Sequence, residues 1–153
     1  MRLHLLEART TVPLPIEEVF RFFAAAENLE RITPSSLRFS ILTPLPIEMR
    51  EGALIDYRLR LMGIPFGWKT RITRWDPPHE FVDEQLSGPY KVWRHRHRFH
   101  TIDEGTEIED RVEYALPLGP LGLIALPVVK LQLRGIFAHR QRVVRQLLLG
   151  EAA

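Results

Sequence analysis

Two alternating segments, residues 91–101 and 107–114, constrain the fold of this chain more than any other feature. On one parity they carry Trp93, His95, His97, Phe99, Ile108, Asp110, Val112 and Tyr114, and on the other parity almost only charged side chains. Because successive side chains of a strand point to opposite faces of a sheet, this alternation indicates half-buried strands. Asp103, Glu104 and Gly105 supply a turn between them, so the two segments predict a β-hairpin.

Opposite charges select the register of this hairpin. A pairing of Thr101 with Thr106 across a four-residue loop sets opposite charges face to face in the pairs His100/Glu107, Arg98/Glu109 and Arg94/Glu113. Each such pair is worth roughly 0.2–1 kcal/mol. The one like-charge pair is Arg96/Arg111, and a shift by one pair would oppose Arg98 to Arg111 instead. On the other face the same register opposes Phe99/Ile108, His97/Asp110, His95/Val112 and Trp93/Tyr114.

Imidazoles and a carboxylate therefore lie within an otherwise apolar face. Burying such groups is unfavourable unless they are paired. The sequence leaves two explanations open: His97 and Asp110 satisfy each other inside a core, or this face borders a cavity that holds something polar.

Glycines and prolines divide the rest of the chain into short elements. Predicted strands cover residues 3–11, 37–42, 53–62, 66–75 and 79–86, and two short helices cover residues 16–26 and 27–32. A long amphipathic helix is predicted over residues 121–149, with a kink or break at Pro127. The fold class is α+β: a seven-stranded, curved antiparallel sheet wraps around the C-terminal helix, with two short helices between the first two strands.

Composition limits the possible functions. With 153 residues and 45% hydrophobic content, the chain can bury about 70% of its unfolded surface, enough for one domain over residues 1–153. The absence of cysteine excludes thiol chemistry. We find no uninterrupted apolar run of the ~20 residues that span a bilayer and no signal peptide, so we expect a cytoplasmic protein without integral membrane association. The excess of arginine over lysine and the 12 prolines indicate a thermophile or a GC-rich genome.

Three stretches, GPYKVWRHRHRF, GTEIEDRVEYALPLGPLG and RGIFAHR, resemble the SRPBCC superfamily, the helix-grip fold of START domains, birch-pollen-allergen-like proteins and polyketide cyclase/dehydratases. The order of predicted elements resembles it over the full length. The W-x-H-x-H-x-F and D-x-V-x-Y patterns are similar to those of a bacterial ligand-binding, cyclase/dehydrase-like subgroup. The resemblance implies a deep apolar cavity between sheet and long helix that takes a lipid, polyketide or isoprenoid.

Candidate ligand-binding residues follow from the strand faces and the aromatic content, although core packing explains each aromatic singly. They are Phe66, Trp68, Trp93, His95, His97, Phe99, Asp110, Tyr114 and Phe137. We predict a hydrophobic small-molecule ligand and no cofactor; the oligomeric state is left open. The alternative is a cyclase/dehydratase-type enzyme in which His97 is the general base, Asp110 orients it, and Tyr114 or His95 donates a proton.

Two further candidates are set aside. His95 and His97 could ligate zinc together with Asp110, but no fourth ligand is evident, and we predict no metal. The run of arginines on residues 94–98 faces glutamates on the second strand, so we predict a solvated face and no nucleic-acid binding. Solvated charge is also expected for the helix arginines Arg134, Arg140, Arg142 and Arg145, with a contact to an anionic membrane or headgroup as the alternative. No nucleotide, serine-hydrolase or zincin motif is present.

Overall fold

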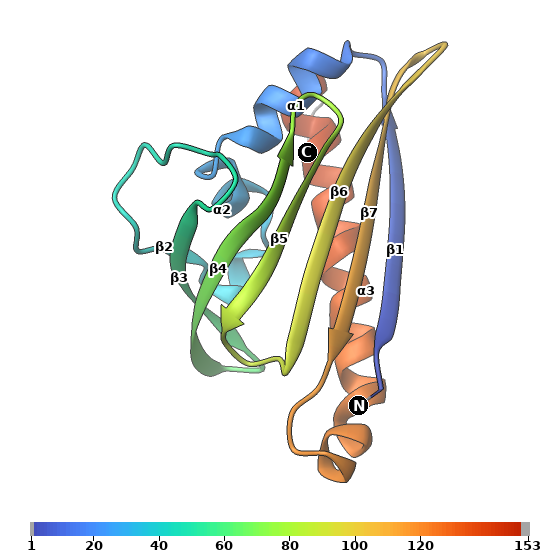
Figure 1. Ribbon diagram of the computed structural model, residues 1–153. Helices are drawn as coiled ribbons and strands as arrows, with labels where there is room; N and C mark the ends of the chain where they lie inside the picture. The colour runs from blue at the N-terminus through green and yellow to red at the C-terminus, as the bar shows by residue number, and fades with distance from the viewer. Residues whose placement is uncertain (1, 151–153) are drawn as a thin grey trace.

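The computed structural model describes residues 2–150. Its elements are β1 (His4–Val12), α1 (Ile16–Ala24), α2 (Asn28–Ile32), the 3₁₀ helix η1 (Ser35–Leu37), β2 (Ser40–Ile41), β3 (Leu54–Leu61), β4 (Ile64–Asp76), β5 (Glu80–Ser87), β6 (Val92–Ile102), β7 (Gly105–Ala115) and α3 (Pro120–Leu149). The predicted fold class is confirmed: the described strands form one seven-stranded antiparallel sheet in the order β1-β7-β6-β5-β4-β3-β2. The long helix α3 runs across one face of that sheet (Figure 1).

The central hairpin has the predicted register. Thr101 pairs with Thr106, and every further pair follows as expected, including Arg94 with Glu113. The loop is shorter than predicted, because Ile102 also pairs with Gly105 and leaves only Asp103 and Glu104 in the turn. The charged face of the hairpin joins the next strand as well, where Arg98 Nε donates to Glu80 Oε2 at 3.1 Å.

One predicted boundary is wrong, and of the two outcomes expected at Pro127 the break does not occur. The strand expected over residues 37–42 is only Ser40–Ile41, because residues 35–37 form a 3₁₀ turn that ends at Arg38 in the left-handed conformation. The helix α3 is continuous through Pro127, so no break occurs there. It ends at Leu149 and is capped by Gly150, whose φ of 66° lies in the left-handed region that glycine favours.

The buried hydrophobic residues form two clusters, each of which joins the sheet to helices. One cluster joins β3, β4 and β7 to α3 through residues such as Tyr57, Trp68, Tyr114 and Leu133. The other joins α1 to β5, β6 and β7, with Phe20 among the buried rings. Helix α1 packs on β6 and β7, while α2 contacts α3. The two short helices thus cover the part of the concave face that α3 leaves open.

Contrary to the expectation from the sequence, helix α3 has the length and apolar composition of a membrane-spanning helix. Its most apolar 18-residue window has a mean hydropathy of 1.6, and 22% of that window is buried. Only the second half of the helix is packed continuously against the sheet, with Leu133, Phe137, Arg140 and Val144 buried. That the chain does not cross a membrane stays a prediction.

Candidate functional site

A cavity of about 160 Å³ lies between the concave face of the sheet and the helices α1, α2 and α3. Its walls are mainly apolar and aromatic. The sheet contributes Ile55, Tyr57, Leu59, Trp68, Phe81, Trp93 and others, and the helices contribute Phe22, Phe23, Leu133, Ile136 and Phe137. Ala26 joins them from the turn between α1 and α2. The polar side chains among the lining residues gather mostly on one wall, where Asp83, His95, His97 and Arg140 meet.

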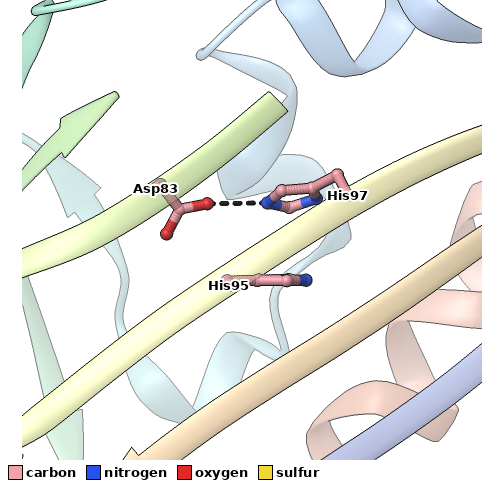
Figure 2. Close-up of side chains that lie close together, drawn as sticks. All are labelled: Asp83, His95 and His97. Carbon is pink, nitrogen blue, oxygen red and sulfur yellow. Dashed lines mark hydrogen bonds and ion pairs between the residues drawn. The ribbon is translucent and has the colours of Figure 1, made fainter. Parts of the chain in front are cut away.

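The two histidines are stacked on the middle of the sheet. Their ring centroids are 3.6 Å apart at an interplanar angle of 24°. His97 Nε2 lies 2.6 Å from Asp83 Oδ2 of β5, the contact drawn in Figure 2. His95 Nε2 lies 2.8 Å from Asp110 Oδ1 of β7. Each imidazole is therefore held by a carboxylate from a different neighbouring strand.

The predicted contact between His97 and Asp110 is wrong as a hydrogen bond, although their backbones are opposite each other as expected. The nearest approach, between His97 Nδ1 and Asp110 Oδ1, is 3.6 Å, too long for one. Both hydrogen bonds run diagonally, since Asp83 is opposite His95 in the ladder but bonds to His97. Diagonal neighbours in a sheet are within reach of long side chains, and a strand register alone does not determine which neighbour a ring meets.

Arg140 is the second correction, because it is buried and not solvated. Only 9% of the residue is exposed, and it falls on the buried stripe of α3 between Phe137 and Val144. One guanidinium nitrogen, Nη2, lies 3.6 Å from Asp110 Oδ1 and 3.4 Å from His97 Nδ1. The guanidinium also lies 5.6 Å from the centre of the Phe137 ring. Arg140 thus supplies the cation that offsets the buried carboxylates.

The charges of this wall shift the pKa values of its groups. Burial alone would raise the pKa of Asp110, but Arg140 and the two histidines hold it well below its ordinary value. Asp83 is buried as well, and its hydrogen bond to His97 lowers its pKa. Burial lowers the pKa of His97 to about 4, with the neighbouring His95 acting in the same direction. At neutral pH the wall therefore holds two carboxylates, one guanidinium and an uncharged His97.

Tautomers follow from these partners. Arg140 Nη2 is a donor, so His97 Nδ1 accepts from it and His97 Nε2–H donates to Asp83. Neither ring nitrogen of His97 is left to take a proton. His95 differs, because its Nε2–H donates to Asp110 and its Nδ1 has no hydrogen-bond partner among the described residues.

The predicted ligand-binding residues divide into two groups. Trp68, Trp93, His95, His97 and Phe137 line the cavity. Phe66, Phe99, Asp110 and Tyr114 do not: Phe99 packs among the phenylalanines of α1 and β5, and Tyr114 lies against His4 and Tyr90. Asp110 contacts two lining residues, His95 through a hydrogen bond and Arg140 through an ion pair, so it acts on the cavity through these side chains.

Several lining residues were missed from the sequence. Asp83 shares its parity with Phe81 on β5, and Arg140 lies on the stripe of Leu133 and Phe137; both patterns are visible in the chain. Tyr57 also lines the cavity, and its burial raises the pKa of its hydroxyl well above the ordinary value. Trp68 is only 7% exposed, yet its Nε1–H has no hydrogen-bond partner among the residues that the structure describes. Buried donors in this state are uncommon in folded proteins.

The cluster of Asp83, His95 and His97 also has the residue types of a metal site. One ligand atom from each lies within 4.8 Å of the others. This set differs from the predicted one, because Asp83 replaces Asp110. The guanidinium of Arg140, 3.4 Å from His97 Nδ1, repels a divalent cation at this wall. Short hydrogen bonds already occupy the Nε2 atoms of both histidines. The arrangement favours a hydrogen-bonded network over a metal centre.

Comparisons with known proteins agree with this geometry. The family described as polyketide cyclase / dehydrase and lipid transport matches residues 12–136. The protein TTHA0849 from Thermus thermophilus superimposes with a TM-score of 0.72 at 18% identity, covering 99% of this chain and 100% of that one.

Similar folds occur in other organisms. Protein Ms6760 from Mycobacterium smegmatis gives a TM-score of 0.70 at 18% identity over 97% of this chain and 91% of that one. Ginseng major latex-like protein 151 from Panax ginseng gives 0.64 at 12% identity over 94% and 95%. A search of curated proteins found no match. The match over most of the length, with the helix-grip architecture around an apolar cavity, shows that the chain belongs to the polyketide cyclase/dehydrase and lipid transport family.

Proposed function

We propose that this protein binds a hydrophobic small molecule that carries one hydrogen-bond acceptor. The observation that supports this most directly is the mainly apolar, aromatic lining of the cavity, which includes Trp68, whose buried Nε1–H has no hydrogen-bond partner within residues 2–150. Arg140 and His95 lie on the same lining and offer a polar end to the ligand. Ligand sites of this kind combine apolar walls with a few converging polar groups.

The volume of the cavity limits the ligand. Its 160 Å³ is close to that of apolar cavities of about 150 Å³ that bind benzene. A ligand of one ring therefore fits the side chains as they stand. A lipid, polyketide or isoprenoid requires movement of partly buried rings of the lining, such as Phe22 of α1 and Phe39, which lies between η1 and β2. Affinity comes mainly from apolar burial, at about 25 cal/mol per Å².

Native mass spectrometry of the purified protein tests the proposal. We expect an additional mass that is lost on denaturation, and the same additional mass on a Trp75→Phe variant, since Trp75 does not line the cavity. Ala26 lines the cavity and is 7% exposed, so Ala26→Phe fills the space and abolishes loading. An Ala26→Phe variant that still unfolds cooperatively and still carries the additional mass would refute this site.

A second function, proton transfer, is favoured by one observation. His95 is oriented by Asp110 at 2.8 Å, and its Nδ1 is without a partner among the described residues, on a residue that lines the cavity. This is the geometry of a general base held by a carboxylate. The base would then be His95 and not His97, whose two ring nitrogens are already engaged.

Deuterium uptake separates this function from simple binding. A cyclic ketone soaked into the cavity in D₂O would exchange its α-protons faster with the protein than in buffer. His95→Gln should remove the acceleration and keep the binding, whereas His97→Gln should keep both. Equal exchange in the wild type and His95→Gln would leave binding as the function.

A further inference from the structure

An exposed apolar surface covers the first half of α3. The α3 apolar surface consists of Leu118, Leu121, Leu123, Ile124, Val128 and Leu131, whose exposed fractions range from 51% to 75%. Leu121, Ile124, Val128 and Leu131 recur at intervals of three and four residues, which places them along one side of the helix. The opposite side, with Gly122 and Val129, is the side that is buried.

This surface lies at one end of the molecule. The first turns of α3 extend past the end of the sheet where β7 ends (Figure 1). Because the sheet is antiparallel, the turn between β3 and β4 lies at the same end, where Met62 and Ile64 are 62% and 56% exposed. Surface apolar residues are ordinary when scattered singly, but a contiguous group marks an interaction site.

The charges around the α3 apolar surface are of one sign. No aspartate or glutamate occurs between Ala115 and Gly150, whereas Lys130 and Arg134 are exposed next to Leu131. The connections at this end, residues 62–63 and 88–91, contain no carboxylate either. A partner that covers this surface therefore needs an apolar region that accepts the exposed side chains and negative charge beside it.

We propose that the α3 apolar surface docks the protein on an anionic lipid bilayer, with its leucines among the acyl chains and Lys130 and Arg134 at the headgroups. A second copy of the chain fits less well. A symmetric contact would bring Lys130 and Arg134 near their own copies, with no carboxylate in this segment to offset them. The second half of α3 stays in the core, since Phe137, Arg140 and Val144 are buried. The helix thus lies on the membrane and does not cross it.

Sedimentation with vesicles tests the docking. We expect the protein to bind vesicles of phosphatidylcholine with 30% phosphatidylglycerol more strongly than phosphatidylcholine alone. Leu121→Gln with Ile124→Gln should weaken partitioning on the order of a hundredfold, from the loss of two inserted side chains. Lys130→Gln with Arg134→Gln should weaken binding to the anionic vesicles about thirtyfold, at roughly 1 kcal/mol for each charge near the surface. The Lys130/Arg134 variant should bind vesicles of phosphatidylcholine alone about as well as the wild type does.

Matched controls separate docking from folding and from ligand binding. Leu42→Gln with Leu54→Gln removes two leucines that are 52% and 48% exposed elsewhere, and it should bind vesicles as the wild type does. The ligand mass seen by native mass spectrometry should be unchanged in the Leu121/Ile124 variant. The two measurements are therefore independent, and a failure of membrane docking leaves the proposed ligand binding unaffected. Two results would overturn the proposal: equal partitioning of the wild type and the Leu121/Ile124 variant, or a dimer in sedimentation velocity that this variant converts to a monomer.

Discussion

Replacing Arg140 with methionine tests whether the buried cation holds the polar wall together. Arg140 Nη2 lies 3.6 Å from Asp110 Oδ1, and the arginine is 9% exposed. At that distance, with an effective dielectric constant of about 20, the attraction is roughly 5 kcal/mol. Breaking a buried pair by removing one partner costs about 3–5 kcal/mol. We therefore expect Arg140→Met to lower the free energy of unfolding at pH 7 by about 3–5 kcal/mol.

The loss should depend on pH in a defined direction. In the wild type the pKa of Asp110 lies below its ordinary value, so the ion pair contributes fully at any pH above that ordinary value. Without Arg140 the pKa of Asp110 rises, and protonation near pH 4 removes the isolated charge. Urea denaturation at pH 7 and pH 4 should thus show a larger loss at pH 7. Arg142→Met, at an exposed position of the same helix, should change stability by less than about 0.5 kcal/mol. An equal effect of the two variants at pH 7 would refute the role assigned to Arg140.

Two further predictions concern stability. Burial lowers the pKa of His97 from 6.5 to about 4. As the pH falls, His97 is therefore protonated in the unfolded chain before it is protonated in the folded protein. The free energy of unfolding should drop by about 3 kcal/mol between pH 6.5 and pH 4. His97→Gln should flatten this part of a stability–pH curve, whereas a wild-type curve that is already flat there would contradict the assignment. Two glycines of α3 provide the other test, which is made by thermal unfolding. A Cβ on Gly122 would lie 2.3 Å from the Pro117 carbonyl oxygen, whereas a Cβ on Gly135 would meet nothing within 4 Å. Gly122→Ala should lose about 1–3 kcal/mol and Gly135→Ala should gain about 0.5–1 kcal/mol; the reverse order would show that α3 begins differently.

Charge pairing made the centre of the fold predictable. The hairpin carries opposite charges on one face, so only one register sets Arg98 against Glu109 and Arg94 against Glu113, and that register is present. The segment before β3 carried no such constraint. Leu37 has strand character in the sequence, but Pro34 and Ser35 lead into a 3₁₀ turn that competes with the strand.

The candidate site was less predictable than the fold, because parity assigns a side chain to a face but not to a partner. His97 and Asp110 are opposite each other in the ladder, yet they do not form a hydrogen bond. Each imidazole instead meets a carboxylate that lies two residues along the neighbouring strand from its opposite residue: His97 meets Asp83, and His95 meets Asp110. Arg140 was misjudged for a different reason. Arginine is rarely buried without a partner, and its partner Asp110 lies on a strand remote in the sequence.

Two of the three tryptophans, Trp68 and Trp93, border the cavity, while Trp75 packs on Phe20 and Phe81 outside it. Indole emission shifts with the polarity of its surroundings and with quenching by adjacent groups. The intrinsic fluorescence of the protein therefore reports cavity occupancy without a label. A Trp75→Phe variant removes the one indole remote from the cavity, so titration of that variant against a panel of apolar compounds offers a direct screen for the ligand.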